Sequence, residues 1–495
     1  MITLLHTNDV HGHLTPWTGW EGELKGKTVG GLGRLAGAVA QARREIGENV
    51  LLLDAGDLIG DTMIADLTKG KALITAWNHL GYDAFTIGNH EPDFGVKVLR
   101  ERIDEATFPA VAANLVEREG SKPFTKPYIL KEVAGVTIGI LGLAYPKTAR
   151  TTAAKNIAEV EFEDPVSAVK RYLPKMRQDG AVLAVVLSHL GLSGDKNLAR
   201  SIDGIDVIVG GHSHNRMPQA ELVNGTLIVQ AGAHGSDLGR LDLIFENGKI
   251  TDHRRSLIPL DHDKVPADLN AERLVEELLE PHRKVLDEVV GEAGAWLVRA
   301  QTLAGQVARK RDEESPVDSL FADIVRSETS ADIAFLPGVG YGVAIPPGPI
   351  KAASLRQLLP HDSPVITMQL AGLQIIEILE QAVANAHSDD PAVKVGGMIQ
   401  ISGLRFEYNP AQPARHRIVS LERTGGRWEP NRDYTVVTNS LLAHGGHNYE
   451  SFRRASDVRT GKPQYEMVKE WFGQHSPIST PPLGRIKKTM TRTQR

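Results

Sequence analysis

The sequence predicts an α/β protein in which a layered α/β domain is followed by a smaller α+β domain. In the first half of the chain, short β-branched or leucine-rich runs alternate with amphipathic segments, which is typical of strands spaced by helices. The chain has 495 residues, which is enough for two or three domains at ~150 residues each. A charged, helix-forming stretch from Pro266 to Val290 then separates the two patterns.

The predicted strands of the first half are Ile2–Leu5, Val50–Leu53, Ala84–Ile87, Val136–Leu143, Val182–Leu187 and Val207–Val209. Amphipathic stretches such as Leu35–Ile46 and Val166–Arg177 predict the helices between them. From Leu222 to Ile258 the pattern changes to alternating strands with an Asn247-Gly248 turn, which indicates a hairpin. We therefore expect a first domain over 1–260, a helical connector over 261–294, a second domain over 295–483 and a solvated basic tail over 484–495.

Composition narrows the classes of function. The chain carries 56 Lys and Arg against 61 Asp and Glu, a net charge of -5, which gives no indication of a nucleic-acid partner. It contains no cysteine, so any metal must be held by His, Asp, Glu or Asn. The longest apolar run, Ala181–Leu187, is far shorter than the ~18 residues of a membrane span, so we expect no membrane partner. The opening Met1–His6 resembles a strand and lacks a signal-peptide pattern, so we expect a cytoplasmic protein.

Polar clusters follow five of the predicted strands. In chain order the clusters are Asp9/His11, Asp54/Asp57, Asn89/His90/Asp93, His189 alone, and His212/His214. Ligands of open α/β sheets bind outside the carboxyl ends of the strands. The clusters therefore converge on one site if the strands share a sheet.

The chemistry of these clusters indicates a metal centre. Asp9 and His11 stand two residues apart, as do His212 and His214, and alternate residues of an extended chain face the same way. Carboxylates mixed with imidazoles and one amide suit Zn, Mn or Mg. The number of groups exceeds the need of one tetrahedral ion and fits two divalent ions that share a carboxylate, an arrangement used for displacement at phosphorus. Asp57 is expected to tie its own loop and not to bind metal. The histidines outside the clusters are expected to be structural, and they are His6, His13, His79, His234 and His253.

The motifs resemble a known family. Asp-x-His, Gly-Asp, Gly-Asn-His-Glu and Gly-His-x-His occur in the order of the binuclear metallophosphoesterases. The longer strings beginning at Leu5, Gly88 and Val209 resemble the 5'-nucleotidase/UDP-sugar hydrolase family, and Ile401-Ser-Gly-Leu-Arg-Phe extends the resemblance into the second domain. The resemblance implies a four-layer metallophosphoesterase sandwich, a helical connector and a 5'-nucleotidase-type C-terminal domain that recognises the substrate.

The resemblance also implies residue roles and an activity. One metal would be held by Asp9, His11, Asp54 and His214, and the other by Asp54, Asn89, His189 and His212, with Asp54 bridging. His90 would contact the phosphoryl oxygen or leaving group while Asp93 fixes its ring, and a bridging hydroxide would attack phosphorus. The implied function is a two-metal hydrolase of a phosphoric ester, either a nucleotide or a related phosphorylated small molecule.

The second domain departs from the family pattern. Gly342 and Glu313 stand where the family has arginines that contact the substrate, although Lys310 and Arg311 lie nearby in sequence. His361 replaces a stacking phenylalanine, whereas Tyr449 keeps an aromatic ring in a glycine-rich turn. The residues expected to bind substrate are Arg405, Tyr449 and His361. We weigh Arg405 equally as a surface strand charge and prefer a stacking role for Tyr449 over core packing.

Three alternatives stay open. A sulfur-oxidation thiosulfohydrolase shares the expected fold, but the intact Asn89-His90-Glu91 disfavours it. A 2',3'-cyclic nucleotide phosphodiesterase would use the same metal chemistry. A binding protein with a relic metal site is disfavoured, since such a protein would need neither the intact ligands nor the His90 and Asp93 pair.

Overall fold

The computed structural model describes the chain except residues 21, 247, 300, 304–305, 309–311, 339, 341, 389–394 and 490–495. Two compact units are present, one formed by Met1–Trp17 and Gly26–Lys284 and the other by Thr18–Lys25 and Val285–Arg495. The boundary at Lys284 falls inside the predicted connector. No helix in the described part of the chain has both the length and the apolar character needed to cross a bilayer.

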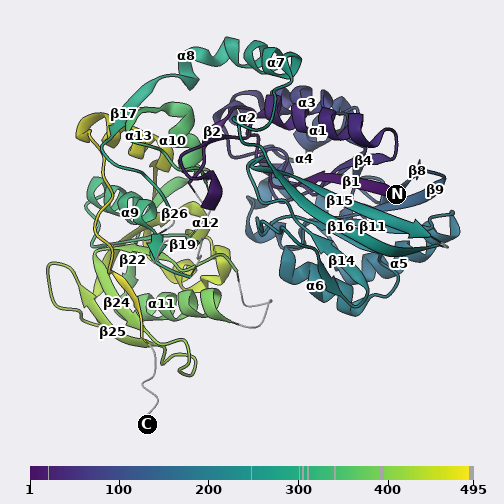
Figure 1. The fold of residues 1–495 in the computed structure, drawn as a ribbon. Coiled ribbons are helices and arrows are strands. Elements are labelled where there is room, and N and C mark those ends of the chain that lie inside the picture. The colour runs from purple at the N-terminus through teal and green to yellow at the C-terminus, as the bar shows by residue number, and fades with distance from the viewer. Residues whose placement is uncertain are drawn as a thin grey trace, which may run out of the picture. The chain divides into compact units, whose positions relative to one another are not determined.

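The first unit contains two six-stranded sheets (Figure 1). The first sheet has the order β16-β15-β1-β4-β5-β6, with bounds Lys249–Pro259, Asp237–Glu246, Ile2–Thr7, Val50–Asp54, Ala84–Thr86 and Ala110–Val111. The second has the order β13-β14-β12-β11-β9-β8, with bounds Glu221–Val223, Thr226–Val229, Val207–Gly210, Leu183–Ser188, Val136–Leu143 and Tyr128–Val133. The six strands predicted for the first half are therefore confirmed, and so is the hairpin, in which Glu246 of β15 pairs with Lys249 of β16.

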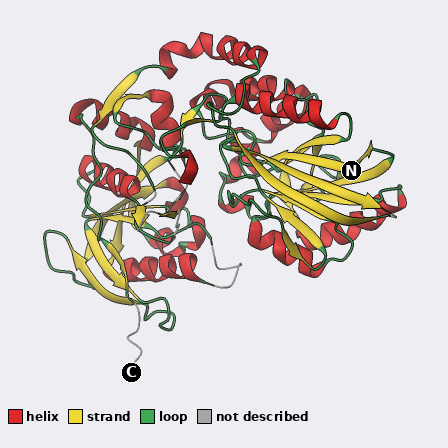
Figure 2. Cartoon of the chain, viewed as in Figure 1, coloured by secondary structure: helices red, strands yellow, loops and turns green. Residues whose placement is uncertain are grey.

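The two sheets face each other across an apolar core, and helices cover their outer faces (Figure 2). Buried residues of both sheets, such as Leu4, Leu53, Val185 and Val209, share one hydrophobic cluster. A second cluster joins β9 and β11 to α5 (Pro165–Gln178) and α6 (Leu192–Ser201). The helices associated with the first sheet are α1 (Leu32–Ile46), α2 (Met63–Thr68), α3 (Lys71–Asn78), α4 (Val96–Glu105) and α7 (Leu269–Leu279). This is the expected four-layer arrangement.

The polar clusters come from both sheets, so the condition that their strands share one sheet is not met. β1, β4 and β5 are parallel neighbours in the first sheet. β11 and β12 are parallel neighbours in the second. The sandwich brings the carboxyl ends of these two sets of strands together, which is how the five loops reach one site.

The second unit is built on a five-stranded sheet of order β23-β20-β26-β22-β27, with bounds Gln400–Ser402, Ile333–Leu336, Asp433–Asn439, Pro364–Ala371 and Ser456–Pro463. A three-stranded sheet has the order β25-β24-β28, with bounds Ile418–Arg423, Leu404–Tyr408 and Ile486–Lys488. The longer helices are α9 (Pro316–Glu328), α10 (Ala352–Leu358), α11 (Gly372–His387) and α13 (Gln464–His475). Ser315 caps α9 by accepting a hydrogen bond from the Asp318 N–H, and Pro316 occupies its first turn.

Two short segments differ from expectation. Residues predicted as the start of a solvated tail form β28, which pairs in parallel with β24, and Arg485 binds Asp323 with Nη2 2.6 Å from Oδ2. The tail prediction is therefore wrong for residues 484–488. The segment Thr18–Lys25, early in the chain, belongs to the second unit. There Trp20 packs against Trp296 with ring centroids 4.8 Å apart.

Candidate metal centre

The loops that follow β1, β4, β5, β11 and β12 bring most of the predicted ligands together. The carboxylate of Asp9 is central to this group, because its Oδ1 lies 3.3 Å from Nε2 of His214 and 3.9 Å from Nε2 of both His11 and His189. Asp9, His11 and His189 are at most 1% exposed. His212 joins the group through its backbone N–H, which donates to Asp9 Oδ1 at 2.9 Å.

The carboxylate shared between the two sides of the group belongs to Asp57. Its Oδ2 lies 3.0 Å from Nε2 of His189 and 3.9 Å from Nε2 of His11. Ligand atoms of Asp57, His189 and His212 lie within 4.8 Å of one another, and so do those of Asp9, His11 and Asp57. Asp57 is therefore common to two candidate ion positions.

Asp54, the predicted bridging ligand, is engaged elsewhere. Its Oδ2 accepts a hydrogen bond from Thr7 Oγ1 at 2.6 Å and its Oδ1 accepts one from the Gly56 N–H at 2.8 Å. Burial raises the pKa of Asp54 well above its usual value, which favours the uncharged acid. These bonds contradict the assignment of Asp54 as the bridge, and Asp57, which we expected only to tie its loop, carries the carboxylate common to the two candidate groups.

Close backbone packing holds Asp57 in position. A Cβ on Gly88 would stand 2.2 Å from Asp57 Oδ1, so only glycine fits there. The same Oδ1 accepts the His90 backbone N–H at 2.9 Å. Glu91 accepts the N–H groups of Leu58 and Gly88 at 2.7 and 2.6 Å, which ties the loop after β4 to the loop after β5.

The imidazole rings are oriented by contacts on their far nitrogens. His189 Nδ1 donates to the Ala55 carbonyl at 2.7 Å, which directs Nε2 toward Asp57. His11 Nδ1 lies 2.8 Å from Asp61 Oδ2, which directs Nε2 toward Asp9. Such outer contacts set the tautomer and orientation of metal-binding histidines.

His90 and Asp93 form the pair that the family resemblance implies, with His90 Nδ1 2.7 Å from Asp93 Oδ2. Burial alone would lower the pKa of His90, but the carboxylates of Asp61, Asp93 and Asp57 outweigh it and raise this pKa well above its usual value. These carboxylates therefore favour the protonated form of the His90 ring.

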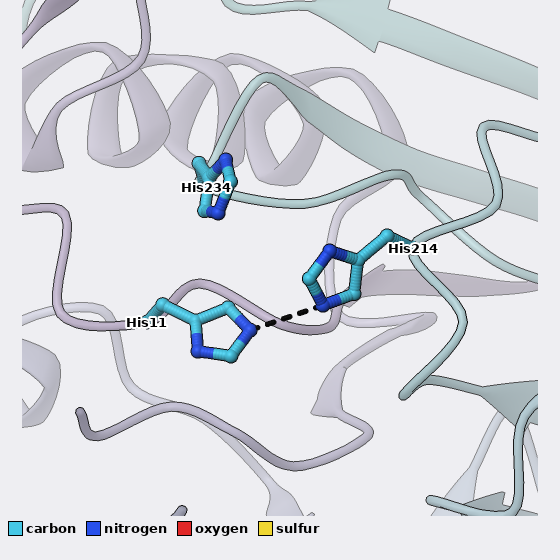
Figure 3. A group of neighbouring side chains, drawn as sticks. All are labelled: His11, His214 and His234. Atoms are coloured by element: carbon cyan, nitrogen blue, oxygen red, sulfur yellow. Dashed lines mark hydrogen bonds between the residues drawn. The ribbon is translucent and has the colours of Figure 1, made fainter. Parts of the chain in front are cut away.

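Three residues of this region were not anticipated. Asp61 contacts His11, and the ring of Tyr145 stacks on His212 with centroids 3.8 Å apart. His234, expected to be structural, lies beside His11 and His214 (Figure 3). The signals in the sequence were Asp61, which follows Gly60 and stands four residues after Asp57, and a histidine in the glycine-rich string Gly232-Ala-His-Gly.

These donors fit divalent cations. The Oδ1 atom of Asn89 is buried and has no hydrogen-bond partner, which is uncommon for a buried polar atom and fits a role as a metal ligand. The Nε2 atoms of His11 and His214 are 3.1 Å apart, which matches two ligands at right angles with bonds of ~2.1 Å. Carboxylate, imidazole and amide donors together suit Zn, Mn or Mg.

In the second unit, the predicted substrate-binding residues lie in different environments. His361 is in the loop between α10 and β22, and Arg405 is exposed on β24 opposite Glu422. Tyr449 is 1% exposed and belongs to the hydrophobic core. Core packing contradicts the prediction that Tyr449 offers an open stacking face.

Gly342 has an arginine beside it. A Cβ on Gly342 would stand 2.5 Å from Nη1 of Arg299, whose Nε lies 3.0 Å from Asp318 Oδ1. Arg299 was not considered from the sequence. Lys310 and Arg311, proposed as substitute cations, lie outside the described residues.

Comparison with known proteins places these features in one family. A family model described as calcineurin-like phosphoesterase matches residues 2–216, and one described as 5'-nucleotidase, C-terminal domain matches residues 290–454. The chain belongs to the 5'-nucleotidase family of calcineurin-like phosphoesterases. The two-domain architecture and the prediction of a hydrolase are thereby confirmed at the level of the family.

Similarities to individual proteins support this family assignment. A trifunctional nucleotide phosphoesterase of Bacillus subtilis is 27% identical over 543 residues, and the match covers 100% of this chain but 35% of that protein. A solved 5'-nucleotidase precursor of Thermus thermophilus is 27% identical, covers 98% of this chain and 99% of its own, and has a TM-score of 0.86. A sulfate thiohydrolase of Thermus thermophilus has a TM-score of 0.87 over 98% of this chain and 96% of its own, and its 23% identity shows a shared fold alone.

Proposed function

We propose that this chain hydrolyses a phosphoric ester of a nucleotide or a related phosphorylated small molecule with the help of two divalent cations. The observation that carries the proposal is the position of Asp57 between His189 and His11, which gives two candidate ion positions one common carboxylate. The first ion would be held by Asp9, His11, Asp57 and His214. The second would be held by Asp57, Asn89, His189 and His212.

Bound cations would supply positive charge to the phosphoryl oxygens and activate water for displacement at phosphorus. The protein adds His90, whose Nδ1 is engaged by Asp93, so that Nε2 is the ring nitrogen that would donate to a phosphoryl or leaving-group oxygen. A charged donor held in a buried site stabilises developing negative charge more strongly than it would in water. Asp61 and Asp93 favour that charge on the ring, because both raise the pKa of His90.

The test uses the full chain, stripped of metal and then supplied with Mn, Zn or Mg. Metal-dependent phosphate release from p-nitrophenyl phosphate and adenosine monophosphate supports the proposal. Turnover restricted to bis-p-nitrophenyl phosphate and 2',3'-cyclic nucleotides would favour a phosphodiesterase, and sulfate release from a cysteine thiosulfonate would favour a thiosulfohydrolase. Binding of two ions without turnover of any ester would favour the binding-protein alternative.

A further inference from the structure

A third histidine stands next to the proposed first ion position. His234, in the loop between β14 and β15, is 1% exposed, and its ring centroid lies 5.6 Å from that of His11 and 5.8 Å from that of His214. One ligand nitrogen from each of the three residues lies within 4.8 Å of the other two. Figure 3 shows the three rings, carried by three separate segments, grouped around a common space.

The backbone at His234 is fastened to the metal-binding loop. Its N–H donates to the Asp9 carbonyl at 2.8 Å, and its own carbonyl accepts from Trp17 Nε1 at 3.0 Å. On one side the ring of His13 packs against it with centroids 4.5 Å apart. The side chain of His234 therefore has a fixed position relative to Asp9 and His11.

His234 shares an unusual backbone conformation with the proposed ligands. Its φ is 56°, and positive φ angles between 49° and 70° also occur at Asp9, His11, Asp57, His212 and His214. Left-handed conformations at residues other than glycine are strained, persist where the surrounding structure holds them and cluster at functional sites. His234 thus shares its left-handed backbone conformation with five of the proposed ligands.

We propose that His234 is a further ligand of the ion held by His11 and His214. This inference rests on the proposed function, because it concerns one of the two ions of that site. Three imidazoles with Asp9 and the shared Asp57 make the first position richer in nitrogen than the second, which combines His189 and His212 with the shared Asp57 and the amide of Asn89. Imidazole favours Zn²⁺ and Co²⁺ over Mn²⁺ and Mg²⁺, so the two positions differ in the metal that they prefer.

The test measures metal binding directly. Asparagine tolerates left-handed φ better than other residues with a side chain, so His234→Asn keeps the loop conformation while removing the imidazole. Metal-free protein is titrated with Zn²⁺ and Mn²⁺ against a chelating dye, and the visible absorption of the Co²⁺ form is recorded. We expect the wild type to bind two Zn²⁺ ions. In His234→Asn one of them should bind at least about 10-fold more weakly, the lower end of the loss seen when residues that merely support a ligand are changed, with a smaller change for Mn²⁺ and an altered Co²⁺ spectrum.

His13→Gln is the matched control, since His13 packs on His234 but belongs to none of the convergent groups found among the described residues. It should keep both Zn²⁺ affinities, and thermal unfolding of each metal-free variant reports on folding. His234→Ala serves as a second variant with the same expected loss. Unchanged Zn²⁺ affinity and Co²⁺ spectrum in both His234 variants would overturn the inference, and so would equal losses in His13→Gln. Either result leaves the proposed function standing, which instead fails if the wild type binds no divalent ion.

Discussion

The carboxylate of Asp57 lies directly against the imidazole of His189, with Oδ2 3.0 Å from Nε2. The same oxygen is 3.9 Å from His11 Nε2 on the other side of the site.

Removing the negative charge of Asp57 should weaken the binding of both ions. We expect Asp57→Asn to lower metal affinity and turnover by more than ~10- to 100-fold. That range is typical of substitutions at residues that hydrogen-bond to a ligand but do not bind the metal themselves. Asp54→Asn should keep two ions per chain, because Asp54 binds Thr7 and Gly56 and favours its neutral form. Elemental analysis and kinetics of the two variants check this, and the reverse ranking would restore Asp54 as the bridge.

The paired ring of His90 should act on the reaction and leave metal binding unchanged. We expect His90→Ala to lower kcat by about 100- to 10,000-fold, the range typical of a positioned acid or donor. Metal content should stay at that of the wild type, since Asp93 and the Asp57 loop, rather than an ion, hold His90. Loss of an ion from the variant would make His90 a ligand.

The glycine at position 342 should not accept a side chain. Its φ is 118°, and an added Cβ would lie 2.5 Å from Arg299 Nη1. The strain alone is of the order of 1–3 kcal/mol, so Gly342→Ala and Gly342→Arg should both lower the free energy of unfolding. From the sequence, Gly342→Arg is expected to lower KM for a nucleotide; the contact with Arg299 argues against that gain. A stable Gly342→Arg variant with tighter nucleotide binding would contradict this prediction.

Tyr449 should contribute to folding and have little direct part in binding. Its ring is buried beside Phe452, with centroids 6.1 Å apart. Removing a large buried aromatic side chain costs about 3–5 kcal/mol, so Tyr449→Ala should strongly lower the urea midpoint, while Tyr449→Phe keeps it near the wild-type value. If Tyr449→Ala instead raises KM for nucleotides and unfolds normally, the ring has the stacking role that the sequence suggested.

His6 should make stability depend on pH. It is fully buried on β1, and burial, with a smaller contribution from Arg255, lowers its pKa well below the ordinary 6.5. Below pH 6.5 His6 therefore binds a proton in the unfolded chain but not in the folded chain. The free energy of unfolding that this residue contributes above pH 6.5 is consequently lost as the pH falls. We expect His6→Leu to flatten the fall in unfolding free energy between pH 7 and 5 by up to about 1.4 kcal/mol per pH unit. Urea titrations at both pH values measure this, with His253→Gln, which replaces an exposed histidine on β16, as the comparison variant.

The strands and the five loops of the site were predictable because apolar runs and polar clusters are local features of the sequence. Which of two nearby carboxylates reaches the site was not. Asp54 ends β4 and turns toward Thr7, whereas Asp57 follows a turn and has a φ of 55°. That choice depends on loop conformation and on Gly88 and His90 from another strand. The place of His234 in the site was not predictable for a similar reason, since its backbone hydrogen bond to Asp9 joins residues 225 positions apart in the chain.

The segment Thr18–Lys25 has a practical consequence for dissecting the molecule. The polypeptide leaves the first unit after Trp17, returns at Gly26 and leaves again after Lys284, so three peptide connections join the two units. A single protease cut near Lys284 would leave the units linked through residues 17 to 26. A recombinant fragment that ends at Lys284 would carry Trp20 without Trp296, the ring it packs against, and would present that indole to solvent. Independent expression of the first unit therefore calls for replacing residues 18–25 with a short polar loop as well as truncating the chain.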